Sequence, residues 1–458
     1  MHQNIHIIQK KLGYSSDLVC RKIMDISYIY LESLTNDKKI SNYISKSIIN
    51  NTFGINNINN KINSPNIIEL SNLDDAYYYI LSGFTIVFQD KNIIFWAVET
   101  RESLDRSITE STSEPILRGP KDSFNENYNT NIGLIRKRIK DKSLRVNEIK
   151  LGEKTQNKVG IIYLNDLVNL KLLNKIINYL NQIKIDGLID SGYIREYLEK
   201  NTNTSFPTII TTERPDLTCQ SILNGKITII VENSPIILIL PATLSDFFKI
   251  PEDYYQKPLN ATISRILRYL ALIITVITPA FYIALMTYNQ EMIPDQLLIS
   301  LASQRTQIPF PTFIEVMIYI IIFEMLRQAD IRSPNIAGAS MSIVGALILG
   351  DAAVNAGLVS PMVIIVVSLT SICELIFNNI DFNNAIRQWR MLFIISTIFT
   401  GLIGFLMGII LLIIKLASIE NNNVPYLTPL SPLNKNLFVD GLVIKAKTRK
   451  EQKKWKNY

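Results

Sequence analysis

Three polar residues share one side of the apolar segment that begins at Pro361. On a helix, which turns 100° per residue, Ser368, Ser371 and Glu374 fall within about 120° of arc. A helix that is polar on this side and apolar on the other can line an aqueous pore in an oligomer. Serine hydroxyls can also bond back to carbonyls of their own helix, so pore lining and ordinary helix packing are both open interpretations.

Further carboxylates interrupt the apolar runs of the C-terminal half, at Glu315, Glu324 and Asp351. A carboxylate at membrane depth is costly, and it marks an ion or proton path or a buried ion pair. Glu324 could simply pair with Arg327 near a membrane interface. We therefore expect Asp351 and Glu374 to be the functional members of this acidic set.

Other kinds of site chemistry are not supported by the sequence. Cys20, Cys219 and Cys373 are far apart and form no CxxC pair, while His2 and His6 lie in the first few residues. No P-loop, GxGxxG after a strand, nucleophile elbow or carboxylate–histidine set is present. We predict no metal, no cofactor and no enzymatic activity.

Two uncharged runs in the second half are long enough to cross a membrane. Tyr269–Tyr288, at 1.5 Å per helical residue, spans roughly 30 Å, and arginines precede it. The second run is Leu392–Ile414, which we predict to be one continuous helix. It contains Gly404 and Gly408, a spacing that lets two helix backbones approach closely.

The region between these two runs is less regular. Small residues recur at every fourth position of Ile336–Leu358, which predicts a stripe for a close helical neighbour; they are Gly338, Ser342, Ala346 and Gly350. With the helix after Pro361, this segment predicts a hairpin that turns near Gly357–Ser360. Met292–Arg327 is broken by prolines and charges, so we predict a re-entrant or interfacial helical hairpin there.

The ends of the chain predict its orientation. The basic tail carries seven Lys or Arg residues between residues 445 and 456, and no signal peptide is recognisable at the start. The positive-inside tendency therefore places both ends in the cytoplasm, which requires an even number of crossings. Four crossings fit if Met292–Arg327 does not cross, although Arg387 and Arg390 then fall on the outer side. Six crossings would require both short segments to span.

The first part of the chain contains an internal repeat. Tyr30-Leu31 recurs as Tyr163-Leu164, and each copy is followed by a predicted helix and later by a Leu-x-Gly before a β-hairpin. We predict an α/β cytoplasmic region of two tandem related subdomains, followed by an all-α polytopic membrane domain. The expected boundaries are 1–140, 141–260, 261–418 for the membrane domain and 419–458 for the tail.

A motif-bearing linker joins the two copies. Proline and glycine mark a shaped loop, and the helix after it has isoleucines on one face and basic residues on the other. The basic face is either solvated or an interface to a neighbouring subunit or to acidic lipid headgroups. The candidate interface residues are Glu114, Pro115, Arg118, Gly119, Pro120, Asn131, Arg136 and Arg138.

At this linker the sequence resembles a known family. Residues 114–139, EPILRGPKDSFNENYNTNIGLIRKRI, closely resemble the corresponding segment of A subunits of GerA-family spore germinant receptors. The resemblance continues through IPEDYY (250–255), FEMLRQA (323–329), IVGALILG (343–350) and VPYLTP (424–429). It covers nearly the whole chain.

The resemblance implies a multi-pass protein of the spore inner membrane, with its N-terminal region and tail on the spore-core side. Its expected partners are the B and C subunits of the receptor, further copies of itself and membrane lipids, and no nucleic acid. The implied function is a subunit of a nutrient-responsive receptor that oligomerises into a ligand-gated cation channel and starts germination. The alternative is a non-conducting scaffold that couples nutrient binding in a partner to downstream germination proteins.

Overall fold

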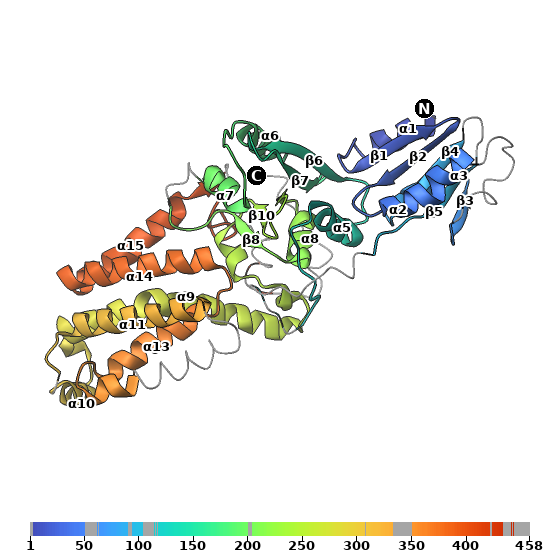
Figure 1. Cartoon of the computed structure of the whole chain (residues 1–458). Helices are drawn as coiled ribbons and strands as arrows, with labels where there is room; N and C mark the ends of the chain where they lie inside the picture. Colours follow the sequence, from blue (N-terminus) through green and yellow to red (C-terminus); the bar gives the residue numbers. More distant parts are fainter. Residues whose placement is uncertain are drawn as a thin grey trace.

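The chain folds into two β-sheets followed by a group of long helices, as the computed structural model in Figure 1 shows. The structure describes residues 3–50, 62, 64–89, 94–103, 114, 116, 118–199, 204–306, 308–332, 350–421, 424–433, 441 and 443. The second sheet lies between the first sheet and the helices (Figure 1). The α/β region predicted for the first half and the helical character of the second half are therefore both present.

The first sheet has five antiparallel strands in the order β1-β2-β4-β5-β3. Its strands are β1 (Leu18–Ile23), β2 (Ile26–Leu31), β3 (Ile67–Leu70), β4 (Phe84–Gln89) and β5 (Phe95–Glu99). Every residue of β4 is buried, because both faces of the sheet are covered. The helical segments that accompany this sheet are α1 (Gln3–Lys11), α2 (Asp37–Lys39), η1 (Ile40–Ser45), α3 (Lys46–Asn50) and α4 (Leu73–Ile80).

The second sheet repeats the strand order of the first, as β6-β7-β9-β10-β8. Its strands are β6 (Leu144–Leu151), β7 (Asn157–Leu164), β8 (Ile210–Thr212), β9 (Ile227–Val231) and β10 (Ile237–Leu240). The accompanying helices are α5 (Tyr128–Arg138), α6 (Leu170–Asn181), α7 (Ser191–Glu199) and α8 (Pro215–Leu223). The repeat seen in the sequence is therefore a repeated topology.

Equivalent glycines begin the hairpin in each copy. Gly83 has φ +86° and Gly225 has φ +88°, a conformation that favours glycine. A Cβ atom would lie 2.9 Å from the Leu34 carbonyl oxygen at Gly83, and 2.8 Å from the Leu167 carbonyl oxygen at Gly225. The same backbone packing is thus built twice.

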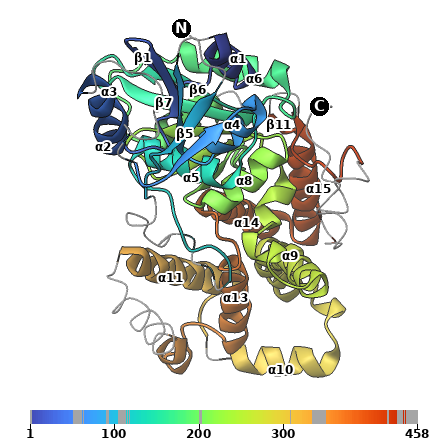
Figure 2. The same cartoon turned by 90° about the vertical axis from the view of Figure 1, so that its right-hand side faces the viewer.

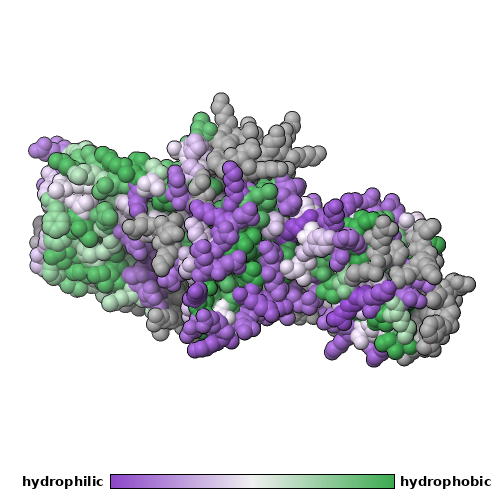
Figure 3. All heavy atoms as spheres, turned by 90° about the horizontal axis from the view of Figure 1, so that it is seen from above, coloured by the Kyte–Doolittle hydropathy of each residue, from purple (hydrophilic) through white to green (hydrophobic). Residues whose placement is uncertain are grey.

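The C-terminal part is helical and carries much of the apolar surface, which is green in Figure 3. Its helices are α9 (Pro258–Thr287), α10 (Asp295–Arg305), α11 (Thr312–Arg332), α13 (Pro361–Glu374), α14 (Ile380–Thr400) and α15 (Leu402–Ser418). Among the described residues, α9 is the one helix long and apolar enough to cross a membrane, and α13 and α15 are shorter apolar helices. Short 3-10 helices at Leu244–Phe248 (η3) and Pro251–Tyr254 (η4) lead from the second sheet into α9, and η5 (Gln290–Met292) follows it.

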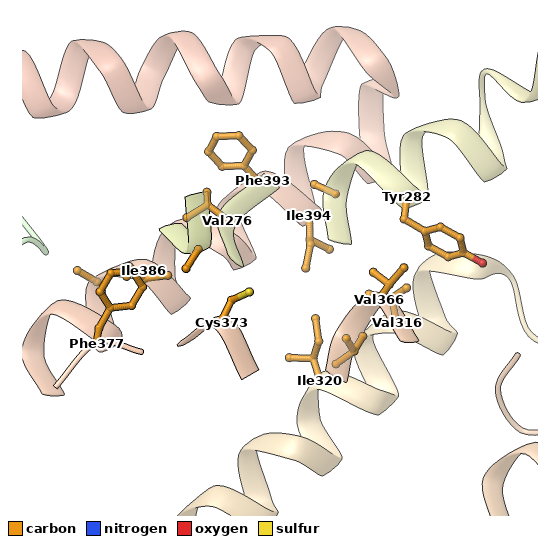
Figure 4. Packing of buried hydrophobic residues seen from close by; sticks show 14 of the residues in the cluster. Val276, Tyr282, Val316, Ile320, Val366, Cys373, Phe377, Ile386, Phe393 and Ile394 are labelled. Carbon is orange, nitrogen blue, oxygen red and sulfur yellow. The ribbon is translucent and has the colours of Figure 1, made fainter. Parts of the chain in front are cut away.

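A shared core holds α9, α11, α13 and α14 together. Figure 4 shows Val276 of α9, Cys373 of α13 and Phe393 of α14 facing one another, with Ile320 of α11 below them. These side chains are buried or nearly so. In water, burying an apolar side chain contributes roughly 1.5–3 kcal/mol to stability. Where lipid surrounds the helices this hydrophobic contribution is absent, and close packing between the helices stabilises them instead.

The continuous helix predicted for Leu392–Ile414 is wrong. The chain turns back at Gly401, which has φ +63° and separates α14 from α15. The hydroxyl of Tyr288 donates to the carbonyl of Ile398, and its ring leaves no room for a side chain at the turn. Uniform hydropathy cannot reveal such a break, because α14 and α15 are both apolar there.

The two glycines of the predicted GxxxG spacing lie against α14 within the same chain. A Cβ atom at Gly404 would collide with the carbonyl oxygen of Ser396, and one at Gly408 would lie 3.2 Å from the Phe393 ring. The small side chains therefore let α15 pack closely on α14, as Figure 1 shows.

Replacing Gly401 by alanine is expected to destabilise this helical hairpin by about 1–3 kcal/mol. The new Cβ atom would lie 2.8 Å from Cγ of Tyr288, on backbone that a side chain rarely adopts. The measurement is the urea midpoint at which the purified full chain becomes protease-sensitive. Thr400→Ala, at an exposed residue of ordinary helical backbone, is the matched control and should shift this midpoint little; equal midpoints for the two variants would contradict the prediction.

The stretch Met292–Arg327 contains two helices. They are α10, which lies at the end of the helices farthest from the sheets (Figure 2), and most of α11. With 21 residues α11 is about 31 Å long, and it packs on α13 and α9. A re-entrant or interfacial placement of this stretch stays a prediction.

The turn predicted near Gly357–Ser360 is present, and it leads into α13 at Pro361. Residues 350–355 before it are helical. Gly338, Ser342 and Ala346 of the predicted small-residue stripe lie outside the described residues. Gly350 is buried, and a Cβ atom there would lie 3.1 Å from the Tyr319 hydroxyl.

The arginines that precede the apolar part of α14 lie on the side of the α/β region. Trp389, between Arg387 and Arg390, donates from Nε1 to the Ser205 hydroxyl before β8, at 3.2 Å. This contact places Arg387 and Arg390 close to the α/β region. The number of crossings and the side of the membrane on which these arginines lie stay predictions.

Candidate functional site

A buried carboxylate joins α13 to α14. Glu374 is the last residue of α13 and is only 5% exposed. Arg387 donates from Nε to one carboxylate oxygen, and Arg390 donates from Nη1 to the other at 3.1 Å. Since Arg387 and Arg390 are three residues apart on α14, they present both guanidinium groups on one face.

A second carboxylate extends this cluster to α11. Glu324 accepts hydrogen bonds from Nε of Arg327 at 3.2 Å and also from its Nη2. Nη1 of Arg387 lies 3.7 Å from Glu324, so one arginine links both carboxylates. We call these five residues the charge cluster: Glu324, Arg327, Glu374, Arg387 and Arg390. Three positive and two negative side chains give it a formal charge of +1.

The local sequence explains why α13 and α14 meet in this way. Pro361 is the first residue of α13, where a missing N–H costs nothing. After Glu374 a short turn leads to Asn379, whose side chain caps α14 by accepting from the backbone N–H of Phe382 at 2.9 Å. This turn reverses the chain between α13 and α14 and brings Glu374 level with the arginines.

The predicted pore-lining residues do not face the outside of the single chain. Ser371 donates to the Val367 carbonyl of its own helix at 2.9 Å, and it lines a cavity of about 120 Å³ together with Glu374 and residues of α11. Ser368 is half-buried. The exposed face of α13 is instead apolar, and consists of Ile365, Leu369, Ile372 and Leu375. Pore lining by the three residues stays a prediction.

The other predicted carboxylates have contrasting surroundings. Glu315 is fully buried, where Arg305 lies 3.2 Å away and the backbone N–H of Ser360 donates to it at 3.0 Å. It therefore ties the start of α11 to the start of α13. Asp351 is exposed. Glu324 pairs with Arg327, the ordinary ion pair that the sequence also allowed.

The second α/β subdomain is docked on the turn between α13 and α14. Arg195 of α7 forms an ion pair with Asp381, and Asn379 donates to the Thr211 hydroxyl at 3.4 Å. The ring of Phe247 stacks on Phe382 with 5.0 Å between centroids. We call this contact the docking joint, and its Asp381 lies six residues, or about 1.7 helical turns, before Arg387 on α14.

A polar cleft of about 320 Å³ opens beside the docking joint. Glu114 lines it and accepts a hydrogen bond from the Thr212 hydroxyl at 2.6 Å. Burial raises the pKa of the Glu114 carboxyl to about 7, although the Thr212 hydrogen bond and the Arg214 guanidinium lower it. Glu114 can therefore change charge near neutral pH.

Acidification is expected to stabilise the contact that Glu114 makes. Because the folded-state pKa is raised from 4.5 to about 7, the protonated form is favoured on folding; its contribution is complete below pH 4.5 and is lost as the pH rises to about 7. We expect the urea midpoint of the wild-type full chain to fall relative to Glu114→Gln between pH 5 and about pH 7.5. Glu126→Gln, at an exposed carboxyl, should show no such pH-dependent difference. A constant gap between wild type and Glu114→Gln across this range would contradict the assignment.

The linker motif is packed within the chain. The backbone N–H of Arg118 donates to Glu252 at 3.1 Å, and a Cβ atom at Gly119 would lie 2.7 Å from the Tyr255 ring. Two segments that carry the family resemblance, EPILRGP and IPEDYY, thus touch each other. Pro120 accepts from Arg214 at 3.2 Å through its carbonyl, while Pro115 lies outside the described residues.

The basic face predicted for α5 is wrong for its central arginine. Arg136 is 1% exposed and is bound through Nε and Nη2 to Asp17, with a further bond from Nη2 to the Ser15 hydroxyl at 2.9 Å. Asn131 is also buried, and Arg138 pairs with Asp122. The isoleucine face predicted the burial of α5, but nothing local to the helix indicates that a distant aspartate neutralises its other face.

Another buried ion cluster holds the start of α9. Asp253, in η4, accepts from Nε of Arg265 at 2.8 Å and from both Nη atoms of Arg268. Arg268 also donates to the carbonyl of Phe248. In the sequence Asp253 is marked only as part of the IPEDYY segment. Arg265 and Arg268 lie three residues apart before an apolar run, a pattern that calls for an acidic partner.

A known protein family matches nearly the whole chain. The family model described as "Bacillus/Clostridium GerA spore germination protein" matches residues 6–456. "Spore germination protein KA" of Bacillus subtilis (strain 168) is 35% identical over 453 residues, covering 96% of this chain and 83% of that protein. "Uncharacterized membrane protein YfkQ" of the same organism is 36% identical, covering 78% of this chain and 70% of that protein.

A solved structure also matches. It is the N-terminal domain of the A subunit of the Bacillus megaterium spore germinant receptor GerK3, with 27% sequence identity and a TM-score of 0.40, covering 53% of this chain and 94% of that one. The family match extends over nearly the whole chain, through the α/β region and the helices alike. The chain belongs to the GerA family of spore germination proteins, the family of germinant receptor A subunits.

Proposed function

We propose that this chain is the A subunit of a nutrient-responsive germinant receptor in the spore inner membrane. Together with B and C subunits, copies of it form a ligand-gated cation channel whose opening starts germination. The α/β region and the C-terminal tail lie on the spore-core side, and the chain crosses the membrane several times.

The observation that carries this proposal is the physical continuity between the docking joint and the charge cluster. Arg195 of the α/β region binds Asp381 at the start of α14, and Arg387 and Arg390 follow on the same helix. A movement of the α/β region would pull α14 along its axis and separate its arginines from Glu374. A buried ion pair that must break or re-form is a two-state element, which gating requires.

The return of α15 to the α/β region supports the proposed orientation. After α15 the amide of Asn421 donates to the Thr208 carbonyl before β8 at 2.7 Å, and Tyr426 accepts from the backbone N–H of Leu244 at 2.8 Å. Both ends of the helical part therefore meet the same subdomain. This arrangement agrees with the positive-inside tendency of the basic tail.

The test is ion flux from receptor reconstituted with its B and C subunits. Glu374→Gln removes the negative charge that Arg387 and Arg390 bind. We therefore expect this variant to alter the cation flux that follows nutrient addition. Glu291→Gln, at an exposed carboxylate in η5, is the matched control and should conduct like wild type. Unchanged conductance and gating in Glu374→Gln would remove Glu374 from the conducting and gating machinery.

The second candidate is a non-conducting scaffold, and one observation favours it. In the single chain Glu374 is neutralised by two arginines, and the exposed face of α13 is apolar. Such helices would transmit a signal to partners without carrying ions. An intact reconstituted complex that binds nutrient without any ion flux would favour this function over the channel.

A further inference from the structure

The charge cluster has more positive than negative charge, although it lies among helices. Its three arginines face two carboxylates, and Arg390 is only 5% exposed. Nε of Arg390 has no hydrogen-bond partner among the residues that the structure describes. A buried guanidinium group with an unused donor is costly unless an acceptor reaches it.

Two spaces adjoin Arg390. The cavity of about 120 Å³ between α11 and α13 and a groove of about 640 Å³ between α11 and α14 are both lined by Arg390 and Glu324. About 10–15 Å³ is enough for one water molecule, so both have room for a ligand. The groove has a polar end, formed by Arg387, Gln388 and Arg390.

The rest of the groove is apolar and opens on the outside of the helices. Ile320 and Ile321 of α11 face Met391, Leu392 and Ile395 of α14 along it. Ile321, Leu392 and Ile395 are between 40% and 49% exposed. A ligand that matches both ends has an anionic head and a long hydrocarbon chain.

The level of the groove in the membrane matches a lipid headgroup. Trp389, the neighbour of Arg390, donates to Ser205 of the α/β region. Tryptophan is enriched where membrane and water meet, and the polar end of the groove lies at this level. Basic pockets between helices on the cytoplasmic side bind the headgroups of anionic lipids.

We propose that the groove between α11 and α14 is a binding site for an anionic phospholipid. Its phosphate lies beside the guanidinium groups of Arg387 and Arg390 at the polar end, and an acyl chain runs along Ile320, Ile321, Leu392 and Ile395. The negative charge of the lipid offsets the +1 charge of the cluster, while Glu324 stays paired with Arg327. The inference rests on the membrane placement in the proposed function.

The probe is phosphatidylglycerol, compared with phosphatidylcholine, added to the full chain in detergent and detected as bound lipid by native mass spectrometry. We expect phosphatidylglycerol to bind about tenfold more tightly, the effect of roughly one additional charge-assisted interaction. Arg390→Gln should abolish this preference. Ile395→Trp, which fills the apolar end and keeps every charge, should weaken the binding of both lipids.

Lys415→Gln is the matched control, because it removes one basic residue of α15 outside the groove, and it should leave the preference unchanged. If Lys415→Gln and Arg390→Gln lost the preference for phosphatidylglycerol equally, the preference would come from general charge attraction, which would overturn the proposed site. If inorganic phosphate displaced the lipid, the groove would be a site for a free anion, and the proposal that a phospholipid occupies it would be wrong. Wild-type binding by Ile395→Trp would overturn the acyl groove even if Arg390→Gln proved unfolded.

Membrane retention after alkaline carbonate extraction separates the two proposals. A chain that is washed off membranes would contradict the proposed function and this inference together. A retained chain with no preference for phosphatidylglycerol would overturn this inference alone. A retained chain that selects phosphatidylglycerol in a receptor without ion flux would support the site and contradict only the channel.

Discussion

Asp253→Asn is expected to destabilise the full chain by about 3–5 kcal/mol, the usual effect of removing one partner of a buried ion pair. Asp253 is 1% exposed, and its carboxylate is bound by Arg265 and Arg268, which are themselves buried. The amide of asparagine would leave two guanidinium groups facing each other without a negative charge. The measurement is the urea midpoint for protease sensitivity of the purified full chain.

The location of Asp253 gives this prediction a second readout. Its bonds tie the IPEDYY segment to the first turns of α9, so their loss should speed hydrogen exchange in residues 250–268 more than elsewhere. Glu291→Gln, at an exposed carboxylate beyond the other end of α9, is the control and should shift neither readout. Removing Arg268 as well should add less than its separate effect, since the two residues act as a unit. A wild-type midpoint for Asp253→Asn would show that the carboxylate does not hold α9.

The second large effect is expected for Asp17→Asn, at about 3–5 kcal/mol as well. Asp17 accepts from the hydroxyls of Ser15 and Ser33 at 2.8 and 2.9 Å, besides its ion pair with Arg136. The neighbouring Ser16 donates its backbone N–H to the Val146 carbonyl of β6 at 2.9 Å. The ion pair between Asp17 and Arg136 therefore holds the segment before the first sheet against both α5 and the second sheet. Losing this ion pair should loosen the contact between the two subdomains.

The effect of Asp17→Asn should depend on pH. Burial would raise the pKa of Asp17, but the Arg136 guanidinium and the hydrogen bonds from Arg136, Ser15 and Ser33 outweigh it and lower the pKa below 3.8. A lowered folded-state pKa contributes stability that is present above pH 3.8 and is lost as the pH falls through the lowered value. The gap between wild type and Asp17→Asn should thus shrink on acidification below this pH.

Asp25→Asn provides the matched control, because Asp25 is an exposed aspartate in the turn between β1 and β2. Its urea midpoint should follow that of wild type at neutral and at acidic pH. A gap of the same size for Asp17→Asn at every pH would show that the side chain contributes through its shape and not through its charge.

The hydropathy and repeat patterns predicted much of the architecture. The uncharged run Tyr269–Tyr288 coincides with the second part of α9, which ends at Thr287. The duplicated Tyr-Leu and Leu-x-Gly elements lie at matching places of two sheets with one strand order. Local patterns succeed here because burial repeats with the period of each helix or strand. The family resemblance in the linker likewise needed only contiguous residues.

The sequence predicted only some residues of the candidate site. A carboxylate inside an apolar run stands out, so Glu374 could be predicted, whereas its pairing with Arg387 and Arg390 could not, because both arginines lie on the next helix. The division of Leu392–Ile414 could not be predicted either, because a single positive φ at Gly401 separates two equally apolar helices. Hydropathy is a sum over side chains and does not respond to one backbone angle.

Patterns in the sequence were enough to predict a duplicated α/β region, an apolar helical part and the motifs of the family. Which charges neutralise one another depends on the three-dimensional fold: Asp17 pairs with Arg136, Asp253 with Arg265 and Arg268, and Glu374 with Arg387 and Arg390. The physical reason is that Coulomb attraction acts between atoms that folding brings close, whatever their separation along the chain. The sequence shows that a charged residue is present, whereas the fold determines whether that residue lines an ion path, forms an ion pair or binds a lipid.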